Sequence, residues 1–109
     1  MADESFRGFV PDQLNALPNL RTKAMFGGYG LYQGERFFGI LFEGGLYFKT
    51  DTKTQPVYVA SGMLPFNYEQ RGRKVTMRYY GVPPDVLEDR IELAAWADRA
   101  IEATKAKEH

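Results

Sequence analysis

The feature that most constrains the fold is a short segment that is apolar on both of its faces. Residues 37–42 read Phe-Phe-Gly-Ile-Leu-Phe, so a strand formed there presents hydrophobic side chains to both sides. Such a strand lies inside a sheet, and each of its faces has to be covered. The chain has 109 residues and no cysteine, which suffices for one two-layer core without disulfides or a thiolate-bound metal. We therefore expect a single domain over residues 1–109.

Glycine-containing turns divide the middle of the chain into strands. A two-residue turn at residues 33–34 would place Gly30 opposite Phe37 in the paired strand. The next turn falls at residues 43–44 or at residues 44–45. These two alternatives differ by one residue in register, and the sequence leaves both open.

The third expected hairpin turns at residues 71–72. This turn places Glu69 opposite Lys74 and Phe66 opposite Met77, so that acid faces base and apolar faces apolar. The complementary pairs predict the register of this hairpin.

Helical segments precede, interrupt and follow the strands. Residues 3–17 carry apolar side chains at helical spacing, and Pro11 among them predicts a kink or two short helices. A short helix over residues 57–61 would end at Gly62. The last helix would begin at Asp89, which can cap it. The apolar stripe expected on that helix consists of Ile91, Ala94, Ala95 or Ala97, and Ile101, with Trp96 beside it.

The chain offers few residues for catalysis or metal binding. Its one histidine, His109, is the last residue, and its two serines are Ser5 and Ser61, so a Ser-His-Asp group cannot be assembled. An acidic group near the last helix fits helix capping better than a cation site: Asp85, Glu88 and Asp89. We expect no catalytic residue, no metal and no cofactor, and hence no enzyme.

The charges balance, with 14 Lys and Arg against 14 Asp and Glu. No overall field therefore directs the chain to nucleic acid or to a membrane surface. The longest apolar run is too short to span a bilayer, and the acidic start lacks the apolar stretch of a signal peptide. These features predict a cytoplasmic protein.

A basic strand nevertheless lies near the third turn. Lys74, Thr76 and Arg78 alternate with apolar residues, so the basic side chains are expected on one face of the strand. The group of cations and tyrosines comprises Arg71, Arg73, Lys74, Arg78, Tyr79 and Tyr80. Cations beside aromatic rings can contact phosphates and bases, which gives the alternative hypothesis of a weak nucleic-acid binder. A solvated sheet face with compensating acids such as Glu69 explains the same pattern.

Glycines cluster at residues 25–32, which read Met-Phe-Gly-Gly-Tyr-Gly-Leu-Tyr. The segment lacks both the G-x-G-x-x-G spacing and the lysine of phosphate-binding loops. A bulge, a tight bend or close packing against the backbone explains these glycines.

Five motifs occur together at residues 23–32 (KAMFGGYGLY), 46–49 (LYFK), 65–68 (PF-x-Y), 75–83 (VTMRYY-x-VP) and 87–89 (LED). In combination they resemble the N-terminal domain of the TfoX/Sxy family over nearly the whole chain. The resemblance implies a two-layer α+β fold similar to secretion-chaperone-like domains. In it, an antiparallel sheet of five to six strands packs with N-terminal, middle and C-terminal helices.

Full-length TfoX/Sxy proteins regulate bacterial competence and are thought to act with the cyclic-AMP receptor protein. They carry a second, helical domain, for which this sequence leaves no room after its last helix. The resemblance thus implies a stand-alone, non-enzymatic regulatory module that binds a protein partner, with transcription machinery as the candidate partner. The residues expected to bind that partner are Arg21, Lys23, Met25, Phe26, Gly27, Gly28, Tyr29 and Tyr32.

The doubly apolar segment also bears on the oligomeric state. The expected helices cover about one face of the sheet, so a symmetric dimer with Phe38 and Phe42 at its interface would bury the other face. The alternative is a sheet that curls and covers its own second face.

Overall fold

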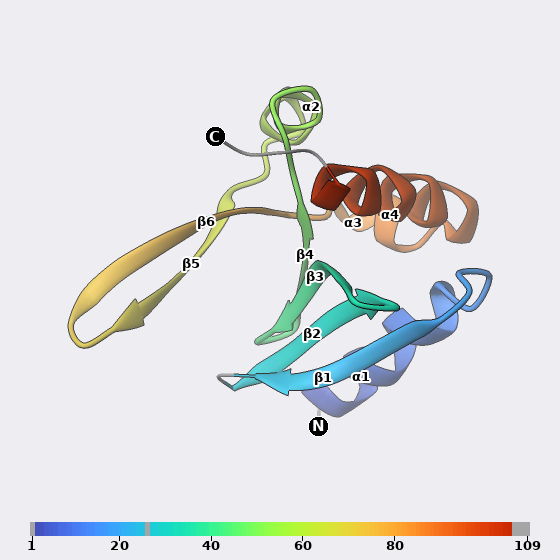
Figure 1. The fold of residues 1–109 in the computed structure, drawn as a ribbon, viewed down its shortest axis with the longest axis horizontal. Coiled ribbons are helices and arrows are strands. Elements are labelled where there is room, and N and C mark those ends of the chain that lie inside the picture. Colours follow the sequence, from blue (N-terminus) through green and yellow to red (C-terminus); the bar gives the residue numbers. More distant parts are fainter. Residues whose placement is uncertain (1, 26, 106–109) are drawn as a thin grey trace.

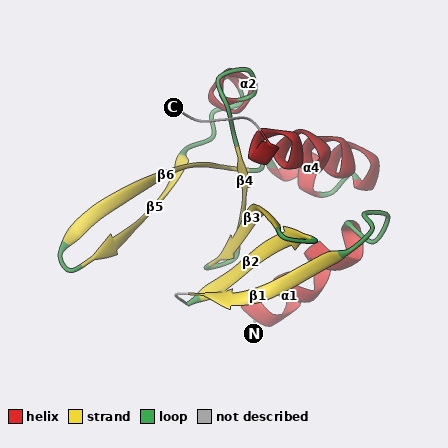
Figure 2. Cartoon of the chain, viewed as in Figure 1, coloured by secondary structure: helices red, strands yellow, loops and turns green. Residues whose placement is uncertain are grey.

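The computed structural model describes residues 2–25 and 27–105. Its six strands form one antiparallel sheet in the order β1-β2-β3-β4-β6-β5, with helices packed on it (Figures 1 and 2). The elements are α1 (Ala2–Gln13), β1 (Leu20–Met25), β2 (Gly28–Gln33), β3 (Arg36–Phe42), β4 (Gly45–Lys49), α2 (Gln55–Ala60), β5 (Pro65–Gln70), β6 (Arg73–Gly81), α3 (Pro84–Leu87) and α4 (Arg90–Lys105). The expected α+β class and the antiparallel sheet are confirmed.

The main core lies between the helices and one face of the sheet. α4 packs on β3 and β4, and α1 and α3 both contact α4. The buried side chains of this core include Val10, Leu14, Leu31, Phe38, Leu41, Leu46, Phe48, Tyr58, Leu93, Trp96, Ala97, Ala100 and Ile101. None of the helices in the described ranges is long and apolar enough to cross a membrane.

The last helix begins as expected but presents a different stripe to the core. The Oδ1 atom of Asp89 accepts hydrogen bonds from the amides of Ile91 (3.0 Å) and Glu92 (3.1 Å), which caps the helix. Ile91 itself is 82% exposed, so the expected stripe is wrong at its start, whereas its members Ala97 and Ile101 are buried. The buried stripe runs from Leu93 through Trp96, because burying the indole ring removes more apolar area from water than burying Ile91 would.

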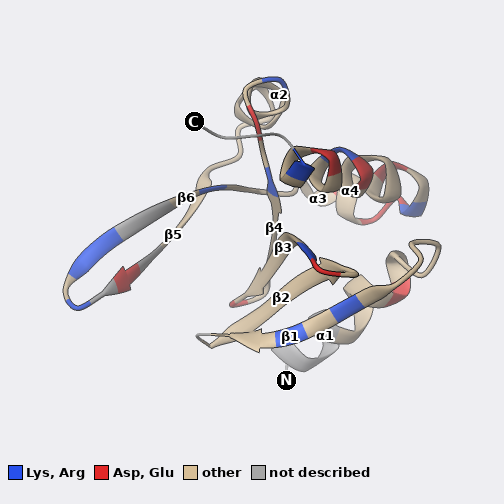
Figure 3. Ribbon diagram, in the orientation of Figure 1, with Lys and Arg blue, Asp and Glu red and all other residues tan. Residues whose placement is uncertain are grey.

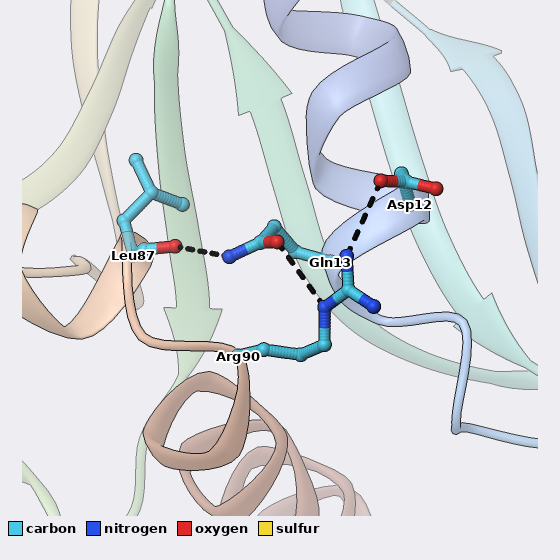
Figure 4. A network of polar contacts seen from close by, with 4 residues as sticks. All are labelled: Asp12, Gln13, Leu87 and Arg90. Carbon is cyan, nitrogen blue, oxygen red and sulfur yellow. Dashed lines mark hydrogen bonds and ion pairs between the residues drawn. The ribbon is translucent and has the colours of Figure 1, made fainter.

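α1 is a single helix that continues through Pro11 and ends at Gln13, so the two short helices considered above do not form. Its end is tied to the other helices by the polar network in Figure 4. The buried Gln13 donates to the carbonyl of Leu87 (3.1 Å) and accepts from Arg90 Nε (3.4 Å). Arg90 also pairs with Asp12 at 3.5 Å.

α2 ends in the way the sequence predicts, although it begins slightly earlier, at Gln55. Gly62 has a φ of +79°, a conformation that glycine adopts without strain. The amides of Gly62 and Met63 donate to the carbonyls of Val59 (2.9 Å) and Tyr58 (3.0 Å), the two bonds of a Schellman motif.

The turn between β2 and β3 lies one residue later than expected. Gln33 pairs with Arg36, so the turn consists of residues 34–35 and not 33–34. Gly34 is the first turn residue and supplies a φ of +60° there. A glycine at this point is compatible with either position, and the sequence therefore did not decide the register.

A β-bulge then changes the pairing of β2 with β3. The register shifts between Leu31 and Tyr32, which places Gly30 opposite Ile40 and not opposite Phe37. The ring of Phe37 still packs over Gly30, with its Cε1 atom 3.0 Å from the place a Cβ would take.

The turns at residues 43–44 and 71–72 have positive φ at both central residues, as in type I′ hairpins. The first of these turns resolves the open alternative in favour of residues 43–44, since Phe42 pairs with Gly45. At these turns Glu43 has a φ of +50° and Arg71 one of +54°, so non-glycine residues accept the left-handed conformation.

The third hairpin keeps the expected pairing only near its turn. Glu69 lies opposite Lys74 as predicted. The register shifts between Pro65 and Asn67, so the expected pairing of Phe66 with Met77 is wrong. The Phe66 ring packs instead against Tyr47 of β4, with centroids 4.9 Å apart.

The second face of the sheet is covered by the sheet itself. Ile40 of β3 packs there with Phe66 of β5 and Tyr79 of β6, although β4 lies between these strands. The Phe42 and Phe66 rings are 5.4 Å apart. The rings of Phe37 and Tyr79 are 5.3 Å apart. The sheet is therefore strongly bent, and the far part of the β5–β6 hairpin extends away from the body (Figure 1).

Gly28 is the glycine whose replacement we expect to destabilise the fold most directly. A Cβ at Gly28 would collide with the carbonyl oxygen of Leu41 and lie 3.2 Å from the Phe42 ring. Backbone cannot move aside cheaply, so Gly28→Ala should lower the free energy of unfolding by about 1–3 kcal/mol. Chemical denaturation measures this loss.

The matched control is Gly8→Ala in α1, where a Cβ would meet no atom within 4 Å. This variant should be neutral or more stable by up to about 1 kcal/mol, because alanine favours a helix over glycine. Equal effects of the two substitutions would contradict the steric argument.

Self-association stays a prediction, but the bend of the sheet changes which residues could form a dimer interface. Phe38 has no exposed surface and packs against Phe48 in the helix-side core, so of the two expected interface residues only Phe42 keeps some exposure. A dimer should give about twice 12.4 kDa by light scattering after size exclusion. That mass should fall in the Phe42→Glu variant. A mass near 12.4 kDa for the unmodified chain would mean that the bend of the sheet alone covers its second face, without a dimer.

Candidate functional site

The glycines of the expected partner-binding segment have structural roles. Between β1 and β2, Gly27 has a φ of +83°, a conformation that glycine adopts without strain. Gly28 passes close to the backbone of β3, as described above. Over Gly30 the side chains of Met25, Tyr32 and Phe37 converge, and a Cβ there would lie 2.8 Å from the sulfur of Met25. These positions fit the close-packing explanation of the segment.

Part of the expected segment does share one surface. Arg21, Lys23 and Met25 alternate along β1 and point to the same face. Tyr32 lies opposite Arg21, so its ring joins them, and it stacks on Phe37 with centroids 5.1 Å apart. Arg21, Lys23, Met25 and Tyr32 are named the β1 face below.

Other expected residues lie elsewhere. Tyr29 pairs with Ala24 and packs against the helix-side core, on the opposite side of the sheet from the β1 face. Phe26 lies outside the described residues, as does His109. The structure therefore brings together four of the eight residues expected to bind a partner.

β1 is an edge strand, and its middle four residues are exposed. They are Arg21, Thr22, Lys23 and Ala24. Arg21 Nη1 donates to the carbonyl of Gly34 at 3.1 Å, which holds the guanidinium over the β2–β3 turn. The sequence analysis did not include Thr22 and Ala24 among the expected partner-binding residues. The signal that could have found them is the lack of hydrophobic alternation in Arg-Thr-Lys-Ala, which is typical of an uncovered edge strand.

The basic residues of the alternative hypothesis lie on the β5–β6 hairpin, and its tip is basic (Figure 3). Arg71, Arg73, Lys74 and Arg78 are all exposed. Arg73 and Lys74 are neighbours in β6, so their side chains leave opposite faces of the two-stranded ribbon.

The two tyrosines expected to help these cations do not lie with them. Tyr79 is only 5% exposed, and its hydroxyl donates to the carbonyl of Phe37 at 3.2 Å. Tyr80 points to the other face of β6 and packs against Tyr58, with ring centroids 6.1 Å apart. The part of the nucleic-acid hypothesis in which Tyr79 and Tyr80 stack on bases beside these cations is therefore wrong.

A small cleft between α2 and α4 has Tyr58 and Trp96 in its walls, with Lys49 and Arg99 also lining it. Burial raises the pKa of Tyr58 above its usual range, so the phenol keeps its proton and is a poor general base. The volume of the cleft is about 10 Å³, room for about one water molecule and far below the roughly 300–1,000 Å³ of typical small-molecule sites. Within the described ranges, no group of three or more His, Cys, Asp or Glu could hold a metal ion.

Comparison with known protein families agrees with the motifs of the sequence. The model of the TfoX N-terminal domain matches residues 12–104, which includes every strand of the sheet, α2, α3 and most of α4. The chain belongs to the TfoX N-terminal domain family. No curated protein matches the chain. In this TfoX N-terminal domain, the β1 face and the basic hairpin both lie within the matched range.

Tyr79 makes the stability of the domain sensitive to alkaline pH. Burial, and in second place the nearby Tyr32, raise the pKa of Tyr79, so the folded state favours the protonated phenol. This stabilisation is complete below the unfolded pKa of about 10 and is lost as the pH rises above it. Tyr79→Phe should cost about 1 kcal/mol at neutral pH and flatten the alkaline loss, as denaturation between pH 7 and pH 11 would measure. An unchanged alkaline slope would contradict this assignment.

Proposed function

We propose that this TfoX N-terminal domain is a non-enzymatic interaction module that modulates transcription in the cytoplasm by binding a protein partner. The observation that carries the proposal is the family match over residues 12–104, because full-length TfoX/Sxy proteins are regulators. The exposed β1 face supplies a surface on which such a partner can bind. Its cations are solvent-exposed, whereas Met25 and Tyr32 are half-buried beside them.

The β1 face has the composition of a protein-binding surface. Tyr, Met and Arg are enriched at interfaces, and an aromatic ring supported by a neighbouring ring loses little conformational freedom on binding. Tyr32 is held in this way by Phe37. The cations beside it would favour a partner that presents carboxylates.

A charge reversal tests this assignment. The double variant Arg21→Glu and Lys23→Glu should lose the partner in a pull-down, because attraction at two exposed positions becomes repulsion. Transcript levels in a strain carrying this variant should match those of a deletion strain. Recovery of no transcription-related protein by the unmodified chain, with unchanged transcripts in the deletion strain, would refute the proposal.

The control is Arg71→Glu with Arg73→Glu, which changes the net charge equally at the hairpin tip. This variant should retain the partner. Loss of the partner here, with retention in the β1 variant, would move the binding surface to the hairpin.

A second function, binding of duplex nucleic acid by the β5–β6 hairpin, is favoured by the distribution of charge. Residues 65–83 contain four Lys or Arg and one Glu, whereas residues 84–105 contain three Lys or Arg and six Asp or Glu. The molecule measures 36 Å along its longest axis, and charges are screened over about 8 Å at physiological salt. A polyanion at the tip would thus meet the local positive charge and not the net charge of zero.

The shape of the hairpin agrees with this second function. A two-stranded ribbon fits the major groove of B-DNA, and cations on both of its faces can reach phosphates on either side. Since Tyr79 and Tyr80 are engaged elsewhere, contacts would be to phosphates and carry little sequence preference.

Binding of this kind depends steeply on salt. Neutralising about three phosphates predicts roughly a 40-fold loss of affinity for duplex DNA between 50 and 200 mM salt. Arg71→Gln with Arg73→Gln should weaken binding and reduce this slope, whereas Arg21→Gln with Lys23→Gln should change neither. Fluorescence anisotropy measures both, and a flat titration at low salt would exclude the second function.

A further inference from the structure

The two edges of the sheet differ in how well they can accept another strand. β5 begins with Pro65, and its pairing with β6 is irregular near Phe66. β1 contains no proline, and all six of its residues, Leu20–Met25, pair with β2 in one uninterrupted register. Every second residue of an edge strand directs its N–H and C=O groups outward, so β1 offers a regular row of donors and acceptors.

The side chains of β1 leave room for another strand. Thr22 and Ala24 on one face are small, and Arg21 and Lys23 on the other are long and exposed. Charged side chains are a common protection of an edge strand against indiscriminate pairing. At this edge they also set a charge requirement for any strand that does pair.

A second copy of β1 does not meet that requirement. Two copies of one strand pair antiparallel about a two-fold axis perpendicular to the sheet, and opposed side chains then lie on the same face. In every register that pairs most of the strand, Arg21 or Lys23 faces Arg21 or Lys23 of the other copy. Like charges directly opposite one another are destabilising, so the edge disfavours its own sequence.

We propose that β1 accepts a seventh strand from a partner whose extended segment carries acidic side chains two residues apart, opposite Arg21 and Lys23. This inference rests on the proposed protein-binding function and names the chemistry of the partner. Main-chain hydrogen bonds to the edge supply affinity in this mode of recognition, and side chains at alternate positions supply specificity. The partner's other alternate residues lie beside Thr22 and Ala24, where small or β-branched side chains fit.

Three ten-residue peptides test the proposal on the full chain. The first alternates Glu and Thr, the second has Lys in place of Glu, and the third is the first with N-methylated alternate residues, which cannot form the ladder. Only the first should bind, and it should slow hydrogen exchange of β1 amides at least severalfold, without changing exchange in β5. Equal binding of the Glu and Lys peptides, undiminished binding of the methylated peptide, or no protection at millimolar peptide would overturn the proposal.

Charge reversal supplies the matched variant. Arg21→Glu with Lys23→Glu should bind the Lys peptide in place of the Glu peptide, and Arg71→Glu with Arg73→Glu should keep the original preference. Unchanged thermal midpoints confirm that both variants fold, as expected for exposed positions.

The outcome is separable from that of the proposed function. Capture of a transcription-related partner that both charge variants retain would overturn strand addition at β1 and leave the regulatory function in place. Binding of the Glu peptide, with no such partner and unchanged transcripts, would leave strand addition in place and refute the regulatory function.

Discussion

The bulge in β3 is the constraint on which the arrangement of both cores depends. It interrupts a strand with two apolar faces, so that Phe38 and Leu41 face the helices while Ile40 faces the opposite side. A bulge also increases the local twist of a sheet, which agrees with the bend that brings Phe66 and Tyr79 over Ile40. One extra residue thus allows a small domain to cover both faces of its central strand with its own chain.

The sequence predicted the class, the order of elements and the turn at residues 71–72, because these depend on local chemistry. Asp89 caps a helix and Gly62 ends one wherever they occur in such a context. The register of β2 against β3 could not be predicted, because it depends on which rings fill the space over Gly30 once the whole sheet has formed. The burial of Tyr79 was missed for the same reason, since it follows from a bend between strands distant in the chain.

Balanced composition concealed an uneven distribution of charge. The hairpin tip carries exposed cations, and the region of α3 and α4 carries an excess of acids (Figure 3). Because screening acts over a shorter distance than the length of the domain, each end presents its own charge to a partner. The zero net charge that argued against nucleic acid at the level of composition therefore does not describe the surface that a ligand would meet.

The glycine-rich segment and the open edge are two consequences of one arrangement. Gly28 has no side chain, so the backbone of β2 lies close to the backbone of β3 there. Gly30 has none either, and the rings of Tyr32 and Phe37 fill the space over Gly30. α4 packs on β3 and β4, and that coverage does not reach the middle of β1, which stays exposed on both faces. The exposed middle of β1 is held mainly by its ladder to β2, whereas Leu20 at its start packs on the helix-side core. The cost of leaving the outer groups of that middle part solvated is small. An added strand would use those groups without unfolding anything, and the cations of β1 decide which strand that can be.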